Sequence, residues 1–335
     1  MFSVGDLFLA DTVKSWYDTS GVLVEQRGFQ NAEAVLNWTR VQQGRGLLGN
    51  PSSNGIIEDF VLMGNSAGAV GAPVWAAKLF DTISARKKAV VADSFVLFMP
   101  SNLEGQLFRD SAKFCTSQLL PAPLITNCSA GEACDLFSLQ SFIVFFHLNF
   151  HHMIGTLQVT DLIQFSMSQL SSVPFSYIQP KRDSVQLFYY NAMMTTYGFE
   201  NIDADEYYEL SKVTIGKLNE NANFVIFLIE STTHCFTYRN IYYTANALSD
   251  TGFSTNQSSF GLAQWVSSLP LSYGESISSV CSGDALDCDP NYSSKTFSLT
   301  TSSPTRPPSC VPTRRPSVTP SATPSAGPSD SPIRN

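Results

Sequence analysis

The stretch that decides the fold is residues 58–80, which read EDFVLMGNSAGAVGAPVWAAKLF. Its first part contains a short apolar run that ends at a glycine, as a buried parallel strand does. Residues 69–80 then repeat apolar side chains at helical spacing. Between the two lies GNSAG (residues 64–68), which matches the pattern G-x-S-x-G. A strand, a tight turn and a helix in this order predict that Ser66 is a nucleophile presented at the end of the strand.

The spacing of this motif follows from the backbone strain that such a turn imposes on Ser66. Glycines two residues before and two residues after the serine let neighbouring backbone segments pass without Cβ clashes. The helix N-terminus directs positive dipole toward the hydroxyl, and the N–H of Ala67 is the natural first oxyanion donor. A chance turn of small residues is the alternative, and the strand–turn–helix context favours the nucleophile.

A serine nucleophile needs a base, and the chain has four histidines. His147, His151 and His152 lie within or just after an apolar helix predicted over 137–150, which favours core or helix-face roles. A metal held by the first two, at i and i+4, lacks the glutamate of an HExxH motif. His234 lies in a polar turn just past an apolar strand predicted over 223–230, where catalytic groups of open α/β sheets gather. His234 is therefore the predicted base.

The third member of a catalytic triad is an acid, and two aspartates stand at predicted strand ends. Asp183 has the better position, one strand before the histidine, and its role would be to hold the imidazole in one tautomer. It is also placed to cap the helix predicted over 185–195, and one residue can do both. Asp93, the other candidate, has a structural alternative as a carboxylate that binds loop amides near Ser66.

The rest of the chain up to about residue 290 alternates short strands with helices. Further strands are predicted over 89–92 and 175–179, and further helices over 31–41 and 161–170. Ala34, Val35, Trp38 and Val41 share one face of the first of these helices. This alternation predicts an α/β domain over residues 1–290, with a mostly parallel sheet flanked by helices. Residues 291–335 are predicted to be a disordered Ser/Thr/Pro-rich tail, either an O-glycosylated stalk or a flexible linker.

Composition narrows the compartment and the partners. Of 335 residues, 43% are hydrophobic and 14% charged, and the net charge is -8. Basic residues are scattered, which argues against nucleic acid as a partner, and no apolar run reaches the roughly 18 residues of a membrane span. Seven cysteines and four N-x-S/T sequons (Asn37, Asn127, Asn256 and Asn291) favour a secretory compartment. A disulfide among Cys115, Cys128 and Cys134 would pin a loop, and the odd number leaves one thiol either free or without its partner in this chain.

With these residues in place, the sequence resembles the pectin acetylesterase/Notum family of carboxylic ester hydrolases. GNSAG followed by AVG resembles that family's G-x-SAGG segment. VVADSF (90–95), PKRDSVQ (180–186) and THC (233–235) resemble the segments that follow it, the last two being those of the catalytic aspartate and histidine. GDLFLAD (5–11), the helix from Gly28 to Trp38 and GLAQWVSSL (261–269) extend the likeness over roughly residues 5–290.

The resemblance implies an α/β-hydrolase-like fold in which Ser66, Asp183 and His234 form the triad. It implies hydrolysis of an ester, most simply an acetyl ester, on a carbohydrate or a lipidated protein outside the cell, with no metal or organic cofactor. Ala69 stands where the family has glycine. The chain begins almost at GDLFLAD, without the first strands and the Gly-rich loop that supplies a second oxyanion donor. This predicts an N-terminally truncated chain.

Other functions stay open at this point. A catalytically impaired binding module on the same fold, displayed on the Pro-Ser-Thr tail, is favoured by the missing loop and disfavoured by the three intact triad residues. A lipase or peptidase of the same fold would differ in the pocket that receives the acyl group. Phe142, Phe145, Phe146 and Phe150 are candidates for its lining, although ordinary core packing explains such a stripe better.

Overall fold

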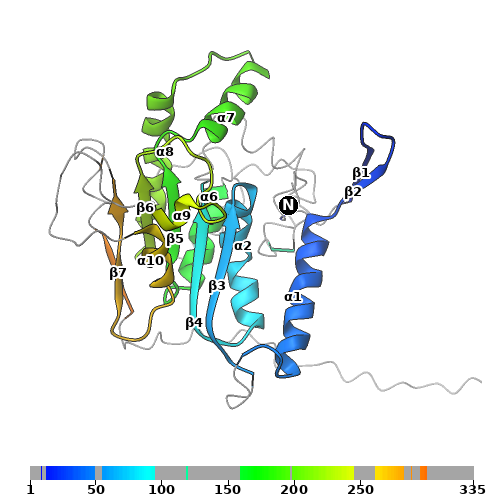
Figure 1. The fold of residues 1–335 in the computed structure, drawn as a ribbon, viewed down its shortest axis with the longest axis vertical. Coiled ribbons are helices and arrows are strands. Elements are labelled where there is room, and N and C mark those ends of the chain that lie inside the picture. The colour runs from blue at the N-terminus through cyan, green and yellow to red at the C-terminus, as the bar shows by residue number, and fades with distance from the viewer. Residues whose placement is uncertain are drawn as a thin grey trace, which may run out of the picture. The chain divides into compact units, whose positions relative to one another are not determined.

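The computed structural model describes residues 9, 13–49, 55–94, 118–119, 159–196, 198–244, 261–282, 288 and 295–299. These residues form an α/β fold in which helices cover a parallel sheet (Figure 1). The predicted fold class is therefore confirmed. The helix expected over 137–150, the three cysteines of the 115–134 loop and the chain beyond residue 300 lie outside the described residues.

Helices and strands alternate along the chain. The helices are α1 (Gly28–Gly44), α2 (Ala67–Thr82), α6 (Val159–Gln169), α7 (Ser184–Thr196), α8 (Ala204–Asn219), α9 (Ile241–Thr244) and α10 (Leu262–Ser267). The strands of the central sheet are β3 (Ile57–Asn65), β4 (Ala85–Asp93), β5 (Phe175–Pro180), β6 (Phe224–Ile229) and β8 (Val280–Cys281). Two antiparallel ribbons pair β1 (Lys14–Tyr17) with β2 (Leu23–Gln26) and β7 (Ser276–Ser278) with β9 (Thr296–Ser298).

The central sheet has the order β3-β4-β5-β6-β8, and every neighbouring pair of strands is parallel. The carboxyl ends of its strands therefore meet at one edge, where α/β proteins build their sites. Asn65 pairs with Asp93, and Asp93 pairs in turn with Ile178. This register brings the Ser66 turn beside the ends of the next two strands.

Two apolar clusters cover the two faces of the sheet, because successive strand residues point to opposite sides. Val90 and Ala92 of β4 belong to the cluster that also takes in residues of α2, α6 and α8. Ala89 and Val91 of the same strand belong to the cluster that contains Trp265 of α10. Both layers are needed because a parallel sheet is apolar on both faces.

The helix predicted over 31–41 is confirmed as part of α1, but its apolar face is not the buried one. Val35 and Trp38 are 63% and 59% exposed. The buried side chains are Phe29, whose ring lies 5.0 Å from that of Trp75 in α2, and Leu36. Figure 1 shows α1 on the far side of α2 from the sheet, so α1 needs only a narrow contact with the fold.

Several elements were missed by the sequence patterns. The β1–β2 ribbon and α8 had no strong periodic signal, although α8 begins with a capping box between Asp203 and Glu206. The β9 strand lies inside the expected tail of residues 291–335, and its Phe297 is buried. Strand structure is therefore present inside the expected tail, at residues 296–298. No helix within the described residues is long and apolar enough to cross a membrane.

Candidate functional site

The turn between β3 and α2 has the geometry that the G-x-S-x-G pattern predicts. Ser66 is the residue between the two elements and has φ 53° and ψ −121°. A Cβ on Gly64 would lie 1.9 Å from the carbonyl oxygen of Gly68, so this position requires glycine. A Cβ on Gly68 would meet nothing within 4 Å in the described part of the chain. The expected need for glycine thus holds before the serine and not after it.

Hydrogen bonds to the neighbouring strand hold the strained turn in place. The N–H of Ser66 donates to the Asp93 carbonyl at 2.9 Å, and the N–H of Ala69 donates to the Ser66 carbonyl at 2.8 Å. Ala67, the predicted oxyanion donor, is the first residue of α2. The N–H groups of a helix's first turn have no acceptor inside the helix. The N-terminus of α2 therefore directs positive potential toward the serine.

Asp183 and His234 come together at the carboxyl ends of β5 and β6. The Nδ1 atom of His234 lies 2.8 Å and 3.0 Å from the two carboxylate oxygens of Asp183. Asp183 is fully buried, and the His234 side chain is 10% exposed. The Oδ1 atom of Asp183 also accepts from the N–H groups of Val185 and Gln186, in the first turn of α7. The aspartate thus caps a helix and binds the imidazole, the two roles predicted for it.

This pairing arises because the two loops continue the parallel ladder beyond the strands. The N–H of Lys181 donates to the Ile229 carbonyl at 2.9 Å, and that of Ser184 donates to the Thr232 carbonyl at 3.1 Å. Asp183 lies between these two donors in the chain, and His234 follows the two acceptors. The backbone therefore sets the separation of the carboxylate and the imidazole.

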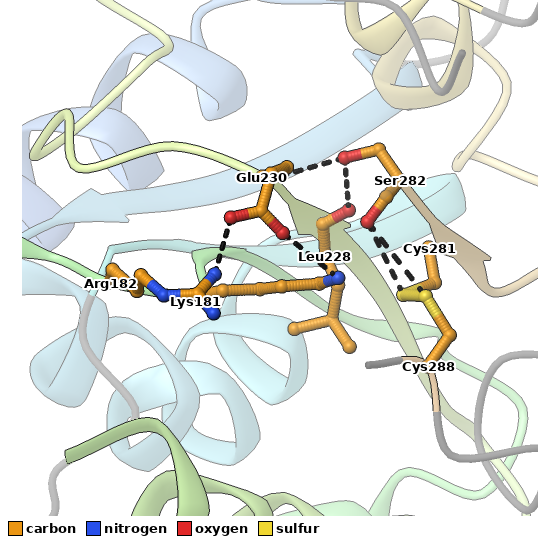
Figure 2. The surroundings of a disulfide bond; sticks show 7 residues. All are labelled: Lys181, Arg182, Leu228, Glu230, Cys281, Ser282 and Cys288. Atoms are coloured by element: carbon orange, nitrogen blue, oxygen red, sulfur yellow. Dashed lines mark hydrogen bonds and ion pairs between the residues drawn. A yellow bond between two sulfur atoms is a disulfide. The ribbon is translucent and has the colours of Figure 1, made fainter. Parts of the chain in front are cut away.

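Ion pairs and a disulfide fix the end of β6 (Figure 2). Glu230 pairs with Lys181 at 3.2 Å and with Arg182, both on the loop that carries Asp183. On the other side the N–H of Glu230 donates to the Ser282 hydroxyl at 2.7 Å. The residue before Ser282 is Cys281, which forms a disulfide with Cys288. The histidine loop is thus anchored on both sides.

Asp93, the second candidate acid, does not contact the imidazole in the described hydrogen bonds. Its Oδ2 atom accepts from the N–H groups of Phe236 and Thr237 at 2.8 Å each, and from the Thr237 hydroxyl at 2.7 Å. The side-chain amide of Asn65 donates to the same oxygen at 3.1 Å and to the Thr237 hydroxyl at 2.7 Å. Asp93 therefore joins the Ser66 turn to the turn after His234.

Cys235, the residue after His234, is a free and fully buried thiol. Its φ of 59° turns the chain sharply after the histidine, and its N–H donates to the Ser94 hydroxyl at 2.8 Å. Burial, and then the charges of Asp93 and Asp183, raise the pKa of Cys235 to about 12, against a hydrogen bond with the backbone of Ser66. The Sγ atom of Cys235 donates to the Asp93 carbonyl at 3.8 Å, and the same carbonyl accepts from the N–H of Ser66, so the residue after His234 lies against the Ser66 turn.

The structure thus brings Asp183 to His234, and brings the histidine turn to the Ser66 turn. Ser66 and His234 are not hydrogen-bonded to each other. The Nε2 atom of His234 is buried and has no hydrogen-bond partner among the described residues. Since Nδ1 is held by Asp183, Nε2 is the ring nitrogen left to accept a proton. Catalytic hydrogen bonds often tighten only when substrate binds.

Sequence reasoning missed the side chains that support these groups. Asn65 and Ser94 each stand beside a residue that was identified, and Thr237 lies three residues after His234, but a single polar residue in a turn carries no periodic signal. Gln186 lies in the quoted PKRDSVQ segment. Tyr207 lies in the undetected helix α8, and nothing in the sequence linked it to the site.

Within the described part of the chain, no group of three or more His, Cys, Asp or Glu side chains could hold a metal ion. His147, His151 and His152 lie outside that part. No protein-family model matches the chain, and no curated protein matches it significantly. What the site can do must therefore be argued from its residues and their geometry.

Proposed function

We propose that this protein is a serine carboxylic ester hydrolase of the α/β-hydrolase type that acts through an acyl-enzyme intermediate. The observation that carries the proposal is the strained Ser66, which stands at the junction of a parallel strand and a helix. The hydrogen-bonded pair of Asp183 and His234 at the neighbouring strand ends supports it. This combination matches the roles of nucleophile, base and orienting acid.

In the proposed reaction the Nε2 atom of His234 takes the proton of the Ser66 hydroxyl while the Oγ atom attacks the acyl carbon. The N–H of Ala67 donates to the developing oxyanion. The protonated imidazole gives its proton to the departing alcohol, and an acyl-enzyme remains. Water, deprotonated by His234, then attacks this ester; the imidazolium returns the proton to the departing Ser66 oxygen, and the acid is released. Asp183 keeps Nδ1 protonated and stabilises the imidazolium in both halves of the reaction.

The substrate class follows from the resemblance to pectin acetylesterases and Notum. It favours an acyl group, most simply acetyl, on an extracellular carbohydrate or a lipidated protein. The proposed location is outside the cell or at its surface, and the disulfide between Cys281 and Cys288 is compatible with an oxidising compartment. The reaction as written uses the protein's own side chains, one backbone N–H and water, with no cofactor.

A second function is a binding module whose catalytic groups are impaired. The observation that favours it is the missing hydrogen bond between Ser66 and the Nε2 atom of His234. An enzyme whose base stays out of reach of its nucleophile would bind an acylated ligand without cleaving it. The two functions differ in whether Ser66 forms a covalent bond.

The deciding experiment is labelling of the full chain with a fluorophosphonate probe, which reacts with an activated serine. We expect the wild-type protein to be labelled, and Ser66→Ala to abolish the label. Ser168→Ala, on the exposed side of α6, is the matched control and should be labelled like the wild type. A wild-type protein that is folded but takes up no label would support the binding module. A series of p-nitrophenyl esters of increasing acyl length then separates acetyl from long-chain specificity.

A further inference from the structure

We propose that Gln186 and Tyr207 are positioning residues that hold the carboxylate of Asp183 in the orientation His234 needs. This inference rests on the proposed function, because it concerns the same triad. The two side chains come from separate helices, α7 and α8, and they affect the rate at which His234 acts as a base by fixing the position of Asp183. Neither side chain is proposed to touch the substrate.

The first hydrogen bond that supports this inference joins Gln186 to Asp183. The Nε2 atom of Gln186 donates to the Oδ2 atom of Asp183 at 2.7 Å. This oxygen is the one nearer to the imidazole, since it lies 2.8 Å from Nδ1 of His234. Gln186 is 3% exposed, so water does not compete freely for the same oxygen. The amide therefore fixes the rotation of the carboxyl group about its own axis.

The second contact fixes which end of the Gln186 amide faces the aspartate. The hydroxyl of Tyr207 donates to Oε1 of Gln186 at 2.9 Å. The remaining amide hydrogen points to Oε1 of Gln179 at 3.3 Å, and the Nε2 atom of Gln179 donates to the Pro180 carbonyl at 2.9 Å. A flipped amide would place a carbonyl oxygen against the Asp183 carboxylate, where two acceptors repel. These bonds together allow one orientation only.

Tyr207 is suited to this role because it keeps its proton. Burial raises the pKa of Tyr207 far above its ordinary value, and the negative charge of Asp183 raises it further. The phenol therefore remains a donor over the whole pH range in which an esterase works. The ring of Tyr207 is held by a T-shaped contact with Tyr190, with centroids 5.9 Å apart. The chain of hydrogen bonds runs from the Tyr207 hydroxyl through the Gln186 amide to the Asp183 carboxylate, which faces the imidazole.

The test uses Tyr207→Phe, which removes the hydroxyl and keeps the ring, in the full-length protein. We expect kcat to fall about 3-fold with KM unchanged, since the substrate is not touched. We also expect the low-field NMR signal of the proton between His234 and Asp183 to move. Tyr208→Phe is the matched control: Tyr208 is equally buried on the same helix, and its ring lies near Lys181 and Lys212. It should change neither quantity.

A second variant, Gln186→Glu, separates positioning from simple packing because it keeps the shape and adds charge. A second carboxylate beside Asp183 favours the protonated imidazole, so the rising limb of the kcat/KM profile should move to higher pH. Gln186→Met, which removes the amide without adding charge, should lower kcat about 10-fold and leave that limb in place.

Unchanged kcat, pH profile and NMR signal in folded Tyr207→Phe and Gln186→Glu would overturn the inference. Failure of the proposed function looks different, because the wild-type protein would then show neither turnover nor probe labelling. In that case the NMR comparison of Tyr207→Phe with Tyr208→Phe would still test the hydrogen bonds from Tyr207 to Asp183. A shift of the His234–Asp183 proton signal in Tyr207→Phe alone would support them.

Discussion

Asp93 and Asp183 invite direct comparison, because Asp93 is the last residue of β4, Asp183 lies in the loop that follows the neighbouring parallel strand β5, and both are fully buried. Asp183 binds an imidazole, an amide and the first turn of a helix. Asp93 binds two backbone N–H groups, the Thr237 hydroxyl and the side chains of Asn65 and Ser94. Asp183 thus contacts an imidazole, which can take up a proton. Asp93 contacts the turn at Phe236 and Thr237 and holds it in place.

The comparison shows that position and burial do not assign a role to a carboxylate. Both aspartates are at the edge where α/β sheets place their chemistry. What differs is the set of partners that the loop after β6 supplies to each carboxylate, and β6 is the direct neighbour of β5 but not of β4. His234 meets Asp183, while Phe236 and Thr237, two and three residues later, meet Asp93. The sharp turn at Cys235, with its φ of 59°, separates the two sets of partners.

The largest expected effect is that of Asp183→Asn on turnover. Asparagine can still cap α7 through its oxygen, but its NH2 group then faces the imidazole and favours the tautomer that carries its proton on Nε2. Such an imidazole cannot take the proton of Ser66, so kcat should fall about 10³- to 10⁴-fold. Steady-state kinetics on an acetyl ester measures this, with the melting temperature as the check on folding. A loss smaller than that of Asp93→Asn would reverse the assigned roles.

Asp93→Asn is the converse test and should mainly affect stability. The asparagine amide replaces one acceptor oxygen by a donor. It also removes the negative charge to which the Phe236 N–H, the Thr237 N–H and the Thr237 hydroxyl donate. We expect the free energy of unfolding to drop by about 2–3 kcal/mol. Urea unfolding measures the drop, and Asp183→Asn on the same scale is its control. Should Asp93→Asn leave stability unchanged and abolish turnover, Asp93 would be the catalytic acid.

Thr237→Val probes a single link in the Asp93 cluster. The substitution keeps the side-chain shape and removes the hydroxyl that donates to Asp93 and accepts from Asn65. A loss of about 1 kcal/mol in unfolding free energy is expected, with a several-fold lower kcat because the histidine turn loosens. Thr233→Val is a matched control in the same turn, since the Thr233 hydroxyl makes no hydrogen bond within the described residues. Equal effects of the two variants would count against a specific role for Thr237.

The smallest expected effect is the pH dependence that Cys235 contributes. Its pKa in the folded protein, about 12, is above its ordinary value near 9, so the folded state binds more protons between these values. Stability from this group is therefore complete below about pH 9 and is lost as the pH rises toward 12. Urea unfolding at pH 8 and pH 10 should show a steeper loss for the wild type than for Cys235→Ala. Parallel losses would mean that burial and the two carboxylates do not raise the pKa of this thiol.

The sequence by itself determined the α/β class, the Ser66 turn and the two polar strand ends. These signals are local: an apolar run, helical spacing and a G-x-S-x-G motif each act within about 20 residues of chain. The same local reasoning finds the helix α1 but not its buried face, because the exposed Val35 and Trp38 give the same periodicity as a buried stripe. It also missed α8, whose buried residues follow helical spacing but include the polar Ser211 and Thr214, while the apolar Val213 is exposed.

Only the tertiary structure decided which carboxylate meets the imidazole and what supports it. Asp183 lies 51 residues before His234, and Asp93 lies 144 residues before Thr237. Contacts over such separations depend on strand order and register, which arise from the packing of both faces of the sheet. The same reason explains why one site includes Ser66, Gln186 and Tyr207. The carboxyl ends of parallel strands lie at one edge of the sheet, whatever the distance between the strands along the chain.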